Sequence, residues 1–217
     1  MKYNYLIIFL LVSLQMGLKA QSMEEVLKKT FEQLEMDTSY QNKLATTNRL
    51  ELIANKWPDH WAPHFYAAYA QMQITFFEPD VKKKDPWLDK AEAHLEKVKE
   101  LKGEADDEWE VLAANMASSR MSIDAANRWM KYGPIFEEHM KTAKAKNENN
   151  PRVYYLRGTS LFYTPKEYGG GAEKALPYFE KAKELFDAEN RDDILDPYWG
   201  FLANNYFLGL CHQALKE

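Results

Sequence analysis

The chain has little glycine, little proline and a single cysteine, and each scarcity limits the possible fold. Nine Gly and nine Pro in 217 residues are too few for the many tight turns of an all-β sandwich. Cys211 has no second cysteine with which to form an internal disulfide, so the protein must be stable without one. These scarcities favour an all-α protein built from helices and short loops.

An excess of positive charge is also missing. The chain carries 28 Lys and Arg against 33 Asp and Glu, a net charge of −5, so we do not expect nucleic acid as a partner. The short motifs of the P-loop, G-x-S-x-G, H-E-x-x-H, C-x-x-C and the EF-hand loop are absent from the sequence. We therefore expect no enzymatic activity, no cofactor and no bound metal.

Two weaker patterns could still hold a small ligand. His60 and His64 would share a helix face with Asp59 and could bind a metal, but Pro63 lies between the two histidines, so structural roles are favoured. The run 169–171 consists of three glycines and could hold an anion at a helix start. Because no Lys-Ser/Thr follows it, a turn between two helices is the preferred interpretation.

The N-terminus has the three-part layout of a secretory signal peptide. Lys2 precedes an apolar run over residues 6–14, and Ala20 is the small residue before Gln21. The run is well short of the roughly 20 residues that span a bilayer, so a membrane anchor is not expected. We predict that residues 1–20 are removed, leaving a periplasmic or secreted protein without a stable membrane span.

Two residue patterns alternate along the chain at helical spacing. The first has an aromatic residue followed by residues at +3, +4 and +7, as in Trp109, Leu112, Ala113 and Met116, and in Trp199, Leu202, Ala203 and Tyr206. The second has a small or apolar residue, a large apolar residue at +4 and a small or apolar residue at +7, as in Ala91, Leu95 and Val98, Phe136, Met140 and Ala143, and Ala175, Phe179 and Ala182. Each pattern falls on one stripe of a helix, so the chain reads as alternating A and B helices. The helices are predicted near 22–36, 40–56, 61–78, 85–101, 105–123, 133–147, 151–164, 173–187 and 196–216.

The linked A and B stripes resemble the tetratricopeptide repeat (TPR) over roughly residues 40–216. Stretches such as 150–158 and 169–175 are similar to a group of small secreted bacterial TPR-like proteins that have no assigned activity. The resemblance implies an all-α fold, a right-handed α-solenoid of TPR-like helix pairs with about nine helices after the signal peptide. Residues 21–217 are expected to form a single domain of this kind.

Aromatic residues make up 14% of the chain and are frequent between residues 57 and 77. We favour core packing between neighbouring helix pairs as their role, since repeat stripes require bulky residues there. The alternative is an aromatic-lined groove for a peptide or a small molecule. Both roles can hold for different residues of the stretch.

Solenoids commonly bind their partners on the concave surface, which predicts a scaffold for a protein or peptide partner. The alternative is a small-ligand carrier or an accessory component of an envelope transport system. Residues beside the A-helix stripes should face the concave surface, and Arg152 could there bind a carboxylate such as a peptide terminus. The predicted partner-binding residues are Arg152, Tyr155, Thr159, Tyr163, Tyr168, Gln71, Glu110 and Asn204.

The signal peptide gives the first testable prediction. Protein purified from its native host should begin at Gln21 and be found outside the cytoplasm, because the apolar run has the length and flanks of a cleaved signal. N-terminal sequencing measures this directly. An intact Met1 in the soluble cytoplasmic fraction would show that the interpretation is wrong.

Overall fold

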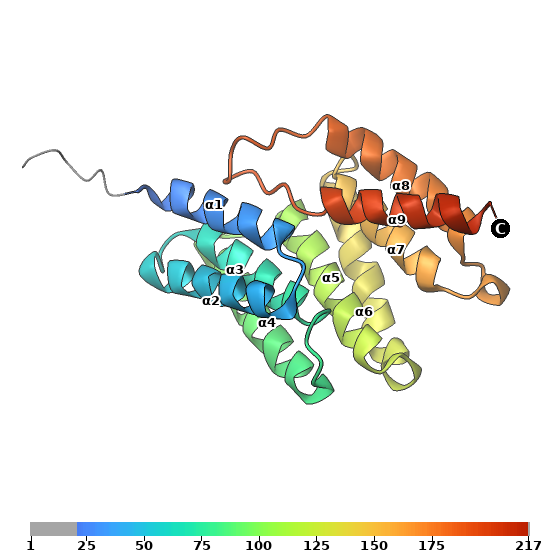
Figure 1. Ribbon diagram of the computed structural model, residues 1–217, viewed down its shortest axis with the longest axis horizontal. Coiled ribbons are helices and arrows are strands. Elements are labelled where there is room, and N and C mark those ends of the chain that lie inside the picture. The colour runs from blue at the N-terminus through green and yellow to red at the C-terminus, as the bar shows by residue number, and fades with distance from the viewer. Residues whose placement is uncertain (1–20, 217) are drawn as a thin grey trace, which may run out of the picture.

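The computed structural model describes residues 21–216, and its regular elements are all helices (Figure 1). They are α1 (Met23–Met36), α2 (Tyr40–Lys56), α3 (Trp61–Ile74), α4 (Val81–Lys102), α5 (Asp107–Ile123), α6 (Ala125–Lys146), α7 (Pro151–Tyr163), the 3-10 turn η1 (Lys166–Tyr168), α8 (Ala172–Asp187) and α9 (Phe201–Ala214). The predicted all-α fold is confirmed over this range. The predicted signal peptide lies outside the described residues, and no helix from α1 to α9 is long and apolar enough to cross a bilayer.

Capping residues explain where several helices begin. Ser22 accepts a hydrogen bond from the Glu25 backbone N–H, while the Glu25 side chain accepts one from the Ser22 N–H, a capping box that starts α1. Asn150 caps α7, and Pro151 follows as its first residue, where a missing N–H costs nothing. These starts agree with the predicted ones.

Consecutive helices pack as antiparallel pairs, α3 with α4, α5 with α6 and α7 with α8, and α9 packs on α8 (Figure 1). The second pattern marks the buried side of the B helices, as predicted. Its buried residues are Ala91, Leu95 and Val98 on α4, Phe136, Met140 and Ala143 on α6, and Ala175, Phe179 and Ala182 on α8. A β-carbon on Gly158 would lie 2.8 Å from the Phe179 ring, so the close approach of α7 and α8 requires glycine there.

The A helices α1, α3, α5 and α7 contact one another in turn and form one layer, against which the B helices pack. The predicted stripe on α5 is buried from Trp109 to Met116. In the aromatic stretch, Phe65, Tyr66 and Tyr69 are buried, which confirms core packing for these residues. Phe76 and Phe77 follow the end of α3 and are exposed.

The last helix starts later than the predicted range 196–216, because Gly200 adopts a φ of 97° and interrupts it. Trp199 therefore lies before α9 and is fully buried, while Leu202 and Tyr206 are 47% and 65% exposed. The predicted packing stripe from Trp199 to Tyr206 is wrong for this helix. A regular spacing describes one stripe only if the helix is continuous.

Pro86 and Pro134 lie inside α4 and α6, which begin earlier than the predicted ranges 85–101 and 133–147. A proline in a helix interior removes one backbone hydrogen bond, so the additional turns must be stabilised by other contacts. A cluster of charged side chains between α4, α5 and α6 supplies such contacts.

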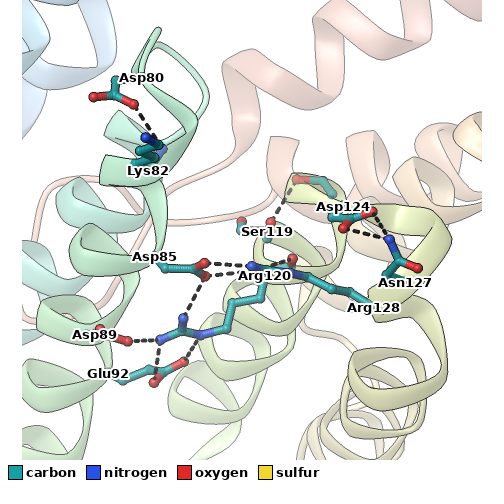
Figure 2. Close-up of polar contacts among 11 residues, drawn as sticks. Asp80, Lys82, Asp85, Asp89, Glu92, Ser119, Arg120, Asp124, Asn127 and Arg128 are labelled. Atoms are coloured by element: carbon teal, nitrogen blue, oxygen red, sulfur yellow. Dashed lines mark hydrogen bonds and ion pairs between the residues drawn. The ribbon is translucent and has the colours of Figure 1, made fainter.

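Arg120 on α5 lies at the centre of this charged cluster (Figure 2). Its Nε donates to Glu92 Oε1 at 2.7 Å, its Nη1 to Asp85 Oδ1 at 3.0 Å, and its Nη2 to Asp89 Oδ1 at 2.5 Å. Arg128, in the early turns of α6, donates to Asp85 Oδ2 at 2.7 Å. The hydrogen bond from Arg128 holds the pKa of Asp85 below its ordinary value. The cluster therefore joins the early turns of α4 and α6 to α5.

The cluster gives a stability prediction. Arg120→Met should lower the free energy of unfolding by about 1–3 kcal/mol, since it leaves Asp89 and Glu92 without their cation and Asp85 with Arg128 alone. Asp89→Asn is the control and should cost less than about 0.5 kcal/mol, because Asp89 is largely exposed. Urea unfolding measures both variants, and equal stability of Arg120→Met and the parent would contradict the prediction.

Candidate functional site

Residues 188–200, here called the crossing segment, connect α8 to α9 and lie across the A helices. Figure 1 shows this connection leaving α8, reaching across towards α1 and α3 and returning to α9. The Tyr66 hydroxyl on α3 donates to Ile194 O at 3.0 Å, and the Trp199 ring lies 5.1 Å from the ring of Tyr69. The crossing segment thus fills the face on which a peptide partner was expected.

Arg152 on α7 fixes the crossing segment in place. Its guanidinium is buried, with the residue 1% exposed, and its Nη2 donates to Pro197 O at 2.6 Å and to Glu189 Oε1 at 2.8 Å. Its Nη1 pairs with Glu108 Oε1 on α5 at 3.1 Å. The guanidinium also lies 5.3 Å from the centre of the Trp199 ring. One side chain therefore joins α5, α7 and both ends of the crossing segment.

Glu108 is the second member of this buried ion-pair network. Besides Arg152, it accepts hydrogen bonds from Asn150 Nδ2 at 2.7 Å and from Trp199 Nε1 at 3.1 Å. Burial raises the pKa of Glu108 to about 7, although the charge of Arg152 opposes the shift. Burial also raises the pKa of Glu189. Burial thus favours the protonated forms of Glu108 and Glu189, while the charge of Arg152 favours their ionised forms.

The predicted partner-binding residues do not gather on an open surface. Arg152 is engaged as described and is not free to hold a partner's carboxylate. Gln71 donates to Glu51, and Glu110 bonds to His139 Nδ1 at 2.7 Å, so each lies buried between an A helix and its neighbour. Residues that lie about 100° around an A helix from its aromatic stripe therefore contact the neighbouring helix and not solvent. The prediction that Gln71 and Glu110 face an open concave surface is wrong.

The other predicted residues lie on or near α7 and α9. Tyr155 is buried, with its carbonyl accepting from the Thr159 hydroxyl at 3.0 Å. Asn204 is buried and donates to Phe179 O at 3.0 Å. Of the predicted binding residues, only Tyr163 and Tyr168 are exposed, as a binding residue should be.

The two weaker patterns have structural roles in the described range. His60 Nδ1 accepts from the Ala62 N–H and caps α3, while His64 bonds to His94 Nδ1 at 2.8 Å and to Pro58 O at 3.0 Å. The glycines at 169–171 form the turn before α8, with φ of 85° at the first and 98° at the third. The preferred interpretation of both patterns is confirmed.

An apolar pocket of about 250 Å³ opens beside the crossing segment. The C-terminal half of α1 forms one wall, and the end of the crossing segment with the start of α9 forms the other. The lining residues are Phe31, Glu32, Glu35, Met36, Arg191, Tyr198, Phe201 and Leu202. The rings of Phe31 and Tyr198 meet edge to face at 5.2 Å, while Met36 and Leu202 are exposed.

The pocket also contains polar groups, which come from Glu32, Glu35, Arg191 and Tyr198. Glu35 accepts from the Tyr69 hydroxyl at 2.9 Å, and burial raises its pKa. Burial likewise raises the pKa of Tyr198 to about 12, so this hydroxyl keeps its proton at neutral pH. Arg191 stacks on Phe201, with its Cζ 3.7 Å from the ring centre. The apolar part of the lining suits binding of an apolar molecule.

Sequence reasoning did not find this pocket. One wall belongs to α1, which precedes the stretch 40–216 that carries the TPR resemblance. The other wall depends on the break at Gly200, which separates Tyr198 from α9. Leu202 and Tyr206 occupy positions of the aromatic stripe, and this spacing indicated core packing. In the structure both are exposed and form an apolar surface on the last helix.

Comparison with solved structures gives a match over almost the whole chain. The match is the HusA haemophore from Porphyromonas gingivalis, with a TM-score of 0.77 and 28% sequence identity over 93% of this chain and 98% of that chain. No family model matches the sequence, and no curated protein matches it. The likeness therefore concerns the whole arrangement of helices and not one repeat.

Glu108 gives a pH-dependent prediction. The folded protein holds the Glu108 proton to higher pH than the unfolded chain, so the stability that this proton contributes is full below pH 4.5 and is lost as the pH rises through about 7. Between pH 4.5 and 8 the parent should lose more than about 1 kcal/mol of unfolding free energy relative to Glu108→Gln. Urea unfolding of both proteins at several pH values measures the difference, which a constant offset would contradict.

Proposed function

We propose that the chain is a carrier of a haem-like tetrapyrrole, which it binds in the pocket between α1 and the start of α9. The observation that carries the proposal is the likeness to the HusA haemophore over nearly the full length of both chains. It favours the small-ligand alternative over a scaffold for a protein or peptide.

The pocket chemistry supports this choice. Tyr198 and Phe201 present aromatic surfaces on one wall and the exposed Met36 lies on the α1 wall, which suits a flat apolar macrocycle. A tetrapyrrole is larger than the 250 Å³ of this open pocket, so part of it would lie against the exposed Leu202 and Tyr206, which are one turn apart on the same face of α9. The ligand is held by one edge and remains accessible for transfer.

The crossing segment also favours a carrier. A peptide on the concave face would have to displace residues 188–200 and expose the buried charges of Arg152, Glu108 and Glu189. Separating buried ion pairs is strongly unfavourable. A small ligand at the edge of the crossing segment needs no such displacement.

Location outside the cytoplasm remains part of the proposal. The signal-peptide layout of residues 1–20 would export the protein to a compartment in which a ligand carrier can act. The N-terminal sequencing described above tests it.

Haemin titration tests the proposed function. Binding should shift the haemin absorbance band and quench tryptophan fluorescence. Leu202→Asp should weaken binding about tenfold or more, because it places a carboxylate against the apolar macrocycle. The variant should keep its melting temperature, since an aspartate in the first turn of α9 interacts favourably with the helix dipole.

Val81→Asp is the matched control. Val81 is an exposed apolar residue in the first turn of α4 and does not line the pocket, so this variant should bind haemin like the parent. Absence of haemin binding to the parent would overturn the proposed function. Equal affinities of the parent and Leu202→Asp would place the ligand elsewhere.

A further inference from the structure

We propose that the pocket holds a carboxylate of its ligand near the start of α9, where Arg191, Tyr198 and the first residues of α9 line the same pocket. This inference rests on the proposed function and deepens it, because it names the ligand group that is recognised. The ligand class is an apolar macrocycle with at least one carboxylate side chain.

Tyr198 supplies an unused hydrogen-bond donor. The residue lines the pocket and is only 8% exposed, and its hydroxyl has no hydrogen-bond partner among residues 21–216. A buried hydroxyl without a partner destabilises the folded protein, since it gives up its bonds to water and gains nothing in return. An acceptor on the ligand would complete this bond.

Arg191 supplies a positive charge that is only loosely paired. Its Nη2 donates to Phe186 O at 2.8 Å, while its buried Nε has no hydrogen-bond partner in the described range. The carboxylate of Glu189 lies 3.7 Å from this Nε, but its other oxygen is paired with Arg152 at 2.8 Å. A guanidinium in this situation can take a further carboxylate.

The start of α9 adds partial positive charge at the same place. Gly200 precedes the helix and has no side chain with which to cap it. Phe201 and Leu202, the first two residues of α9, both line the pocket. The first N–H groups of a helix have no partner within the helix and attract anions.

The carboxylates of the pocket determine the orientation of the ligand. Glu32 and Glu35 lie on the α1 wall, opposite the start of α9, and repel an anion from that side. Lys28 lies one turn before Glu32 on the same helix, and its Nζ donates to Asp192 O at 2.9 Å, which adds positive charge beside the crossing segment. The acidic end of the ligand therefore faces α9, and its apolar body lies between the walls.

The test compares haemin with its dimethyl ester, titrated in the same cosolvent. The ester keeps the macrocycle and the iron but carries no carboxylate. The parent should bind haemin about tenfold tighter than the ester, and Tyr198→Phe and Arg191→Met should each lose about five- to tenfold in haemin affinity. Neither variant should change the affinity for the ester.

Two variants and one stability measurement serve as controls. Tyr178→Phe removes a tyrosine hydroxyl and Arg49→Met a guanidinium at exposed positions outside the pocket. Both variants should keep the parent's affinities for haemin and for the ester. Tyr198→Phe should not lower the melting temperature, because the hydroxyl it removes makes no hydrogen bond. A purely structural role of Tyr198 would lower the melting temperature and both affinities together.

The outcomes separate the two proposals. Equal affinity of the parent for haemin and its ester, with no effect of either pocket variant, overturns the carboxylate subsite and leaves the carrier function standing. Binding of neither compound to the parent overturns the carrier function and the subsite with it. If Tyr198→Phe and Arg191→Met lose affinity for haemin but not for its ester, the result supports both the carrier function and the carboxylate subsite.

Discussion

The buried charge of Arg152 is the constraint on which the rest of the structure depends. A guanidinium removed from water must be paired and hydrogen-bonded, and the partners here are Glu108 on α5, Glu189 and the carbonyl of Pro197. Glu189 and Pro197 belong to the crossing segment, so satisfying this charge brings residues 188–200 onto the A helices. The filled concave face and the position of Tyr198 in the pocket wall both follow.

Sequence patterns predicted the helices well where packing is local. The stripe Ala175, Phe179 and Ala182 faces its neighbour as expected, because a stripe at constant spacing reports the buried side of a continuous helix. The crossing segment could not be predicted in this way. It depends on the positive φ of Gly200 and on ion pairs of Arg152 with residues far away in the sequence.

The same difference between local and long-range contacts explains why the candidate site was not predicted. Arg152 was expected to bind a partner's carboxylate, but the carboxylates it binds belong to its own chain. The concave face is filled internally, and the accessible apolar surface lies where the crossing segment ends, between α1 and α9. A solenoid arranged in this way suits a small ligand at its edge better than a peptide along its length.

A crystal structure of the protein with haemin bound tests the central claim most directly. We predict the macrocycle between α1 and the start of α9, against Phe201 and Leu202, with Arg152 still bonded to Pro197 O and the crossing segment unmoved. Haemin in contact with α3 and α5, with residues 188–200 displaced, would contradict it.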